Sequence, residues 1–531
     1  MKNGFRQSMS WLHTWGGLTV GWILYFVFLT GTLGYFDTEI DRWMKPEVPK
    51  ETASIEQSIA VAKQRLNEKA QGAERWFISP PGNRDTPNLR IFWQMPEQED
   101  GKPGARGNEL LDAKTGELLS GRATGGGQTL YRMHYSLHYI PNNISYWIVG
   151  ICSMFMLVAI ITGVVIHKKI FKDIFTFRSK KGQRSWLDMH NLLSVSALPF
   201  HFMITYSGLI FFLTTYMSLI IAGTYGFGRD AQETFFDEFF AETDKVDASG
   251  TPANLAELST MFAIAEAQWG TGQARYLEVN HPGDSNARVV IARQMDSPLR
   301  SSPELVFNGV TGELLNSKPA TTSTPHTVYD TFLGLHEGLF ANIGLRWLYF
   351  FSGLLGTAMI ATGMILWSVK RRPAQLKKVG GPDFGYRLVE SLNLGTVVGL
   401  PIAVAAYFWA NRLLPIELEN RAQWEVHSMF IVWLICLLSP LLRPVQKGWH
   451  ELLWIAAAVY CLLPVVNGLT TDRHLLNSIN ESDWIFAGID LTFIAVGLLF
   501  AFAASRLQQG AKTEIVAPVR RKKNPTTEAA Y

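Results

Sequence analysis

Four histidines occupy matching places in two stretches of the chain, and their pairing suggests metal chemistry. His13 and His190 each lie 18 residues before a Gly that follows Thr or Ser, and His138 and His336 each follow a Leu. Two equivalent imidazoles that face each other across a helix bundle can fill the fifth and sixth positions of a haem iron. The sequence therefore predicts two haem sites, with these four histidines as axial ligands of the iron.

Three other histidines are further candidates for cofactor binding. His134 lies four residues before His138 on the same helical face and can replace it. His201 lies about three helical turns beyond His190, and His167 ends an apolar segment. The alternative roles for all seven histidines are buried structural imidazoles, packing at a membrane interface or a proton relay.

Eight segments are apolar and long enough to cross a membrane as helices, which requires about 20 residues each. We therefore expect a mainly α polytopic membrane protein in a lipid bilayer. The predicted spans are 11–36, 145–166, 186–216, 347–369, 392–410, 425–442, 451–469 and 484–504.

The distribution of Lys and Arg predicts the orientation of these spans. The N-terminus, the segments 168–184, 370–387 and 443–447, and the C-terminal tail are rich in Lys and Arg, whereas the opposite short loops carry Arg412, Arg421 and Arg473. Basic loops remain on the cytoplasmic side. We expect both termini in the cytoplasm of a bacterium, and the protein in its inner membrane.

The first four spans and two long polar segments form a predicted tandem repeat of two helices each. DAKTGELL at 112–119 matches NGVTGELL at 308–315, and each copy suits two strands joined by a Gly turn. Each polar segment is predicted to be a small α+β domain in the periplasm. The expected organisation is span 1 (1–36), outer domain 1 (37–135), spans 2 and 3 with a basic loop (136–221), outer domain 2 (222–338), span 4 (339–372), spans 5 to 8 (373–505) and a basic tail (506–531).

Composition excludes several other classes of protein. The 17 Trp, 32 Phe and 16 Tyr are too many for a disordered chain, and a net charge of +3 over 531 residues gives no basis for nucleic-acid binding. Cys152, Cys436 and Cys461 all lie in apolar runs, so they cannot build a disulfide framework, a zinc site or a Cys-ligated iron–sulfur cluster.

Several short motifs recur at the ends of the predicted spans and in the polar segments. The motifs are Trp11-Leu-His-Thr-Trp-Gly-Gly, Leu29-Thr-Gly, the TGELL turns, Leu137-His138, Trp186-Leu-Asp-Met-His190, Tyr206-Ser-Gly and Leu335-His-Glu-Gly338. Taken together they resemble the PepSY-associated transmembrane family of bacterial inner-membrane proteins over about residues 5–372. The resemblance implies outer PepSY domains and, as in characterised members, a di-haem b-type core that reduces ferric siderophores. His13, His138, His190 and His336 fall on the family's helix-borne His positions.

The expected activity is electron transfer across the membrane to an iron chelate, with release of ferrous iron for iron acquisition. Oxygen ligands hold ferric iron more strongly than ferrous iron, so reduction weakens the chelate. No nucleotide or flavin motif is visible, so we expect a quinol or a cytoplasmic reductase as the donor. Arg132, Arg184 and Arg346 are candidate partners for haem propionates, with anchoring at the membrane interface as the alternative.

Two other functions are compatible with the same sequence. A permease for iron, a siderophore or a peptide would use polar residues within broken spans, and spans 5 to 8 offer Asn393, Pro401, Pro464 and Asn467. A regulator without enzymatic activity would use the outer domains to restrain a membrane partner and would need no cofactor. The presence or absence of haem separates these alternatives from the reductase.

Overall fold

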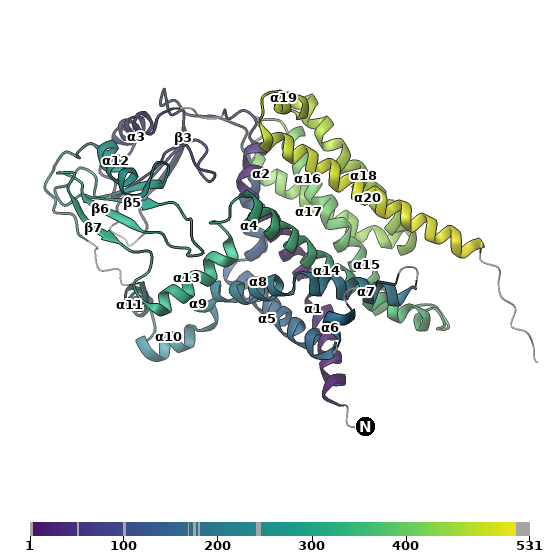
Figure 1. Cartoon of the computed structure of the whole chain (residues 1–531). Coiled ribbons are helices and arrows are strands. Elements are labelled where there is room, and N and C mark those ends of the chain that lie inside the picture. The colour runs from purple at the N-terminus through teal and green to yellow at the C-terminus, as the bar shows by residue number, and fades with distance from the viewer. Residues whose placement is uncertain are drawn as a thin grey trace, which may run out of the picture. The chain divides into compact units, whose positions relative to one another are not determined.

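The computed structural model describes residues 4–49, 53–98, 102–167, 169–173, 177–178, 181–240 and 246–516 (Figure 1). The chain forms two compact units, Met1–Gly381 and Pro382–Tyr531. Both are rich in helices, and the first also carries a small antiparallel sheet. The predicted mainly helical character is confirmed.

Long apolar helices in both units identify a multi-pass membrane protein. Among the described residues, seven helices or joined helices are long and apolar enough to cross a membrane, and an eighth span results if one bent pair counts as a single span. This agrees with the eight predicted spans. In the first unit the straight spans are α1 (Phe5–Gly34), α5 (Asn142–Ile166) and α14 (Ile343–Gln375).

The predicted span 186–216 is broken in its middle. Helices α7 (Gln183–Ser196) and α8 (Leu198–Phe211) meet at an angle of 68°. Pro199 lies in the first turn of α8, where its missing N–H would interrupt a continuous helix but costs nothing at a new helix start. Short helices flank this region: α6 (Ile170–Asp173), α9 (Leu213–Tyr216), α10 (Ser218–Tyr225) and α11 (Arg229–Phe240).

The two long polar segments build one sheet and not two separate domains. Seven antiparallel strands follow the order β3-β2-β1-β4-β5-β6-β7, and β1 pairs with β4 in the register Trp76↔Val279. Unpaired, each of these two strands would be an exposed edge, and their pairing removes both edges. The strands are β1 (Arg75–Ser79), β2 (Leu89–Gln94), β3 (Arg106–Leu111), β4 (Ala274–Asn280), β5 (Arg288–Arg293), β6 (Glu304–Asn308) and β7 (Leu314–Lys318).

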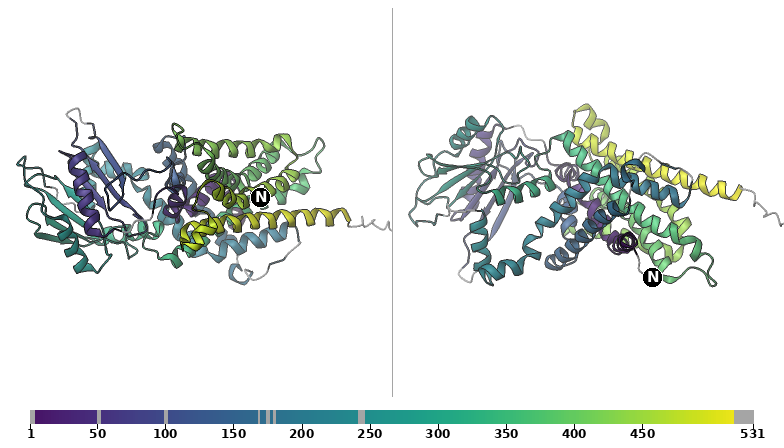
Figure 2. Two further views of the ribbon diagram at one scale, coloured as in Figure 1. Left: turned by 90° about the horizontal axis from the view of Figure 1, so that it is seen from above. Right: turned by 60° about the horizontal axis from the view of Figure 1, so that its bottom comes forward.

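One face of this sheet is covered by α3 (Ile55–Lys69) and α12 (Leu258–Trp269), which also contact each other (Figure 2). Alternate strand residues and the apolar faces of both helices form a single core. Fully buried members of this core include Leu66, Ile78 and Leu277. The sheet is therefore one rigid platform with a contribution from each half of the first unit.

The two TGELL segments adopt the same turn, as predicted. Asp112 and Asn308 each accept hydrogen bonds from the backbone N–H groups two and three residues further along. Gly116 and Gly312 follow with φ values of 76° and 77°, which lie in the left-handed region that favours glycine. This turn joins β6 to β7 in the second copy, whereas the first copy forms only the isolated bridge Leu111↔Leu118.

Three shorter helices connect the sheet to the spans. Helix α2 (Asp37–Met44) follows α1, and α4 (Gly126–Tyr135) packs against both of them. Helix α13 (Thr324–Glu337) packs against α8. Both α4 and α13 carry a histidine in their last turn, and each is followed closely by a span, α5 or α14.

The second unit is a helical bundle with a buried polar cluster. The fully buried Arg421 and Glu425 form an ion pair at 2.5 Å, and Asn411 donates a hydrogen bond to Glu425. Arg412 similarly donates to Asn467. Its helices are α15 (Phe384–Val397), α16 (Gly399–Leu413), α17 (Arg421–Leu442), α18 (Val445–Thr470), α19 (Leu475–Asn480) and α20 (Trp484–Val516).

Candidate functional site

Two pairs of histidine rings face each other inside the first unit. The ring centroids of His13 and His190 are 6.2 Å apart with an interplanar angle of 67°. Those of His134 and His336 are 5.8 Å apart with an angle of 37°. The first pair joins α1 to α7, and the second joins α4 to α13, so each pair links the two halves of the unit.

The same hydrogen bond fixes the orientation of each ring. The Nδ1 atoms of His13, His190 and His134 lie 2.9, 3.0 and 2.7 Å from the carbonyl oxygens of Ala159, Met359 and Val27. A carbonyl only accepts, so Nδ1 carries the proton and Nε2 keeps its lone pair. At His336 the partner of Nδ1 is the hydroxyl of Ser207 at 3.0 Å, and the ring also contacts the main chain of Ile204.

A hydroxyl residue stands three positions after each of these carbonyls. Thr162 Oγ1 donates to the carbonyl of Ala159 that also receives the His13 proton, and Thr362 does the same for Met359 and His190. The remaining two members are Thr30, which donates to Val27, and Ser207, which donates to Ile204.

A glycine directly after each hydroxyl residue makes room for the imidazole. A Cβ atom on Gly208 would lie 2.8 Å from Cε1 of His336, and one on Gly363 would lie 3.2 Å from Cε1 of His190. The corresponding neighbour of Gly163 is His13 at 3.3 Å, and that of Gly31 is His134. The Thr-Gly and Ser-Gly dipeptides are therefore the seats of the four rings.

Each pair of rings lines its own cavity. The first cavity, of about 530 Å³, contains His13 and His190, and the second, of about 400 Å³, contains His134 and His336. Leu24 and Met156 line both, so the two cavities are separated by a single layer of side chains. Both volumes lie in the range of cofactor pockets.

The structure pairs His336 with His134 and not with His138, which corrects the pairing expected from the Leu-His dipeptides. Helix α4 ends at Tyr135, so His138 lies beyond the helix and its ring packs on Tyr139 at 4.3 Å. Equivalent histidines in the two halves are found better by counting residues back from the start of the next span. His134 precedes Asn142 by eight residues and His336 precedes Ile343 by seven, whereas His138 precedes Asn142 by only four.

The two remaining candidates line the first cavity but do not form a ring pair there. His201 is fully buried, and its Nε2 lies 3.3 Å from the carbonyl oxygen of Ser352. His167 is the C-terminal cap of α5 at the end of the cavity that Arg6 also lines. The structure therefore places four histidines in facing pairs and leaves His138, His167 and His201 outside them.

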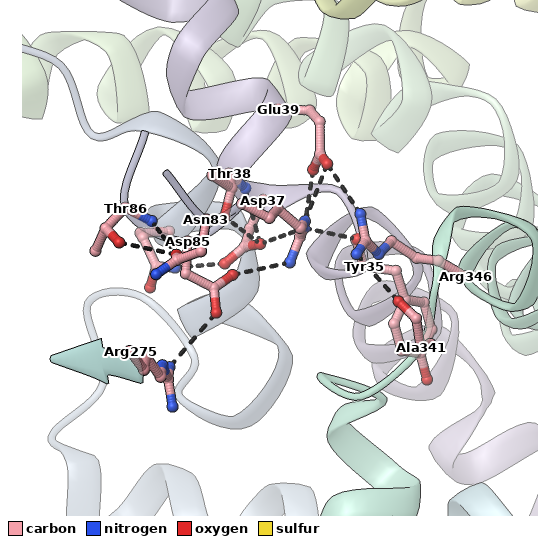
Figure 3. Close-up of polar contacts among 12 residues, drawn as sticks. Tyr35, Asp37, Thr38, Glu39, Asn83, Asp85, Thr86, Arg275, Ala341 and Arg346 are labelled. Carbon is pink, nitrogen blue, oxygen red and sulfur yellow. Dashed lines mark hydrogen bonds and ion pairs between the residues drawn. The ribbon is translucent and has the colours of Figure 1, made fainter. Parts of the chain in front are cut away.

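A network of charged side chains surrounds Tyr35, which lines the second cavity, and joins the sheet domain to α2 and α14 (Figure 3). Arg84, in the loop after β1, binds both carboxylate oxygens of Glu39 at 2.9 and 2.8 Å, and donates to the carbonyl of Tyr35 at 3.0 Å. Arg346 of α14 shares Glu39 at 3.0 Å. The Tyr35 hydroxyl in turn donates to the carbonyl of His336 at 3.3 Å.

The second cavity carries one ion pair and several tyrosines on its sheet side. Arg300 donates to Glu337 at 3.0 Å, and burial raises the pKa of the Glu337 carboxyl although Arg300 opposes the shift. Tyr35 and Tyr131 line the same region. Nearby, burial in α2 raises the pKa of Asp41 to about 6.

Sequence reasoning missed several residues that shape these cavities. The Thr-Gly and Ser-Gly dipeptides were visible as spacing markers, but their contacts with the rings depend on how neighbouring helices pack. Arg346 was a candidate partner for an anionic cofactor and instead binds Glu39. Arg6, Lys370 and Arg371 line the first cavity, although their positions in basic segments indicated only orientation in the membrane.

Comparison with known proteins places the chain in a family. The model of the PepSY-associated TM region matches residues 10–370, which include all four paired histidines. An uncharacterized protein of Pseudomonas aeruginosa is 24% identical over 383 residues, covering 70% of this chain and 92% of that protein. The chain belongs to the PepSY-associated TM family.

Proposed function

We propose that the protein is a di-haem electron-transfer protein that reduces a ferric chelate on the sheet side of a bacterial inner membrane. The observation that carries the proposal is the presence of two facing imidazole pairs, each with Nδ1 directed to a carbonyl or hydroxyl and Nε2 left for a metal. The proposed ligands are His13 and His190 in the first cavity, and His134 and His336 in the second.

The residues present fit a haem b group in each cavity. Two imidazoles bound to one iron have ring centroids about 6 Å apart, from two bonds of about 2 Å and two ring radii. The observed separations are 6.2 and 5.8 Å. A bound haem would supply a one-electron iron couple, and with both imidazoles of a pair holding its iron no position would remain for oxygen. This fits electron transfer and not oxygen binding.

The adjacent cavities support an electron path through the first unit. Leu24 and Met156 line both cavities, so an apolar layer separates two neighbouring sites. We propose that an electron enters at the first site from a quinol or a cytoplasmic reductase, and leaves from the second site. With both termini in the cytoplasm, this outward transfer follows the membrane potential, at about 2.3 kcal/mol per 100 mV.

The proposed acceptor is a siderophore-like ferric chelate. One electron converts its Fe(III) to Fe(II), which oxygen ligands bind less strongly, so iron is released and the chelator is recovered. We interpret the two halves of the sheet as PepSY-like domains that receive the chelate above the second cavity. Arg84 and its partners join this platform to the helix that carries His336 through Tyr35.

The test of this function is reoxidation of the reduced protein by its proposed substrate. The purified full chain is reduced with a stoichiometric amount of dithionite without oxygen and mixed with a ferric hydroxamate, in the presence of a colour reagent for Fe(II). We expect the reduced haem band to decay while Fe(II) appears in equal amount. The His336→Ala variant, which retains the first site, should reduce the chelate much more slowly.

Two results would contradict this function. A haem-loaded protein that stays reduced in the presence of ferric chelates would exclude them as acceptors. Equal rates for wild type and His336→Ala would show that electrons do not leave through the second site.

A further inference from the structure

One end of the first cavity is positively charged. Arg6, Lys370 and Arg371 line it there, together with His167, and the described residues of its lining include no carboxylate. Most of the remaining lining is apolar, with residues such as Leu18, Ile160 and Met364. The cavity therefore combines an apolar body that holds two imidazoles with a cationic mouth.

The cationic mouth of the first cavity lies at a defined distance from the histidine pair along the helix axes. Arg6 precedes His13 by seven residues in α1, which is two helical turns and about 10 Å along the axis. Arg371 follows Gly363, the seat of His190, by eight residues in α14, or about 12 Å. The chain directions of α1 and α14 place both cations beyond the rings on the same side, away from the sheet.

The guanidinium of Arg371 is held in place and does not simply extend into water. It lies 4.0 Å from the ring centroid of Trp367 and 5.2 Å from that of Trp15, and it donates to the carbonyl of Trp367 at 3.3 Å. Arg6 is fixed by a hydrogen bond to the carbonyl of Ile166. Cations that serve only to orient a span need no such contacts, because their flexible stems reach the interface unaided.

The second cavity provides the contrast. The described residues of its lining include Arg300 as the only Lys or Arg, and this guanidinium is paired with Glu337 at 3.0 Å. Its charge is thus compensated by the protein itself. At the first cavity no described lining residue compensates the three cations, which leaves them available to an anion from outside the protein.

We propose that Arg6, Lys370 and Arg371 form a binding site for the two propionates of the haem in the first cavity. This inference rests on the proposed function. A flat apolar ring held at its metal by His13 and His190, with two carboxylates on one edge, matches an apolar cavity with cations at one end. Arginine and lysine bind carboxylates through charge-assisted hydrogen bonds, and the fixed guanidinium of Arg371 loses little entropy on binding.

The test uses reconstitution of the first site with haem and with its dimethyl ester, which lacks the two negative charges. Full-length His336→Ala protein, produced without haem in detergent, isolates this site, and binding is followed by the visible spectrum. We expect haem to bind about ten-fold or more tightly than the ester. In the same background, neutralising Arg6, Lys370 and Arg371 to Gln should reduce this preference to within about two-fold.

Matched controls separate a local site from general charge. Arg372→Gln, in the last turn of α14, and Lys377→Gln, just beyond the end of that helix, remove cations that do not line the cavity, and they should leave the preference unchanged. If the triple variant does not fold, Lys370→Gln and Arg371→Lys provide milder changes, and each should lower the preference part of the way.

The outcomes of this experiment separate failure of the propionate site from failure of the proposed function. Equal affinity for haem and ester, or a preference that survives the triple variant, would overturn the propionate site and leave the haem proposal intact. Loss of anionic lipid from nanodiscs of the triple variant, with an unchanged preference for haem over ester, would assign the cations to a lipid phosphate and also overturn it. Absence of any haem binding in the His336→Ala background would overturn the proposed function as well.

Discussion

The two cavities of the first unit share one design for their histidines and differ in everything around them. In both, a carbonyl, a hydroxyl and a glycine on one helix seat an imidazole that another helix supplies. The first cavity has three uncompensated cations at its mouth, whereas the second has the Arg300–Glu337 pair and several tyrosines.

The same local motif can therefore serve two different tasks. In the proposed function the paired rings hold a metal group, and the surroundings tune its electrostatics and its access. A site that receives electrons and a site that delivers them need different potentials and different partners. Removing a paired imidazole should therefore abolish a site, changing its seat should weaken the site, and changing the surroundings should only adjust it.

The largest expected effect is the loss of a whole site. His190→Ala removes one of two facing imidazoles from the first cavity, so the haem content should fall from two per chain to one. The measurement is haem per protein by extraction and absorbance. His138→Ala is the matched control, because His138 packs on Tyr139 outside both pairs, and it should retain two haems.

Loss of haem in the His138 variant, with retention of two in His190→Ala, would reverse the assignment.

A smaller effect is expected when one of the glycines that seat a ring is substituted. Gly208→Ala places a methyl group 2.8 Å from Cε1 of His336, and the ring must move. Overpacking of this kind costs about 1–3 kcal/mol, so the affinity of the second site for haem should fall roughly ten-fold while the first is unchanged. Gly488→Ala in α20 is the control, since nothing lies within 4 Å of its added Cβ.

An unaltered second site in Gly208→Ala would show that the glycine is not needed to seat the ring.

A pH dependence of stability is expected from Asp41 in α2. Burial raises the pKa of Asp41 to about 6 from 3.8, so the folded state favours the protonated carboxyl. Stability is then highest at low pH and falls as the pH rises from about 4 through 6, by at most about 3 kcal/mol. Thermal unfolding of wild type and Asp41→Asn between pH 4 and pH 8 measures this contribution of Asp41 to stability.

The difference in melting temperature between the two proteins should change in favour of Asp41→Asn as the pH rises. A constant difference would mean that Asp41 is already ionised at low pH.

The smallest effect is expected at Tyr35, whose hydroxyl contacts the carbonyl of His336 at the second site only. Tyr35→Phe removes one neutral hydrogen bond, so the midpoint potential of the second haem should shift by tens of mV at most. A redox titration of both haems reports this change, with the first haem as the internal control. An equal shift of both potentials would point to a general change in folding.

Much of the fold was predictable because it is encoded in local patterns. Spans require long apolar runs, and the TGELL turns require a left-handed glycine, so both were located from the sequence. The single sheet was not, because β1 and β4 pair across about 200 residues and no local signal specifies which open edges will meet.

The candidate site was predicted in part. His13 and His190 have equal spacing to their downstream glycines, and the structure brings them together. The choice between His134 and His138 depends on where α4 ends, and the Leu-His dipeptides do not indicate that end. The cations of the first cavity were hidden among residues whose obvious role was orientation in the membrane, and only the packing of α1 against α14 gathers them.

The most direct test of the central claim is the visible spectrum of the purified full-length protein, recorded before and after reduction, together with its haem content. We predict two haems b per chain with the sharp reduced bands of iron that carries two imidazole ligands. A colourless protein that takes up no haem on reconstitution would contradict the account.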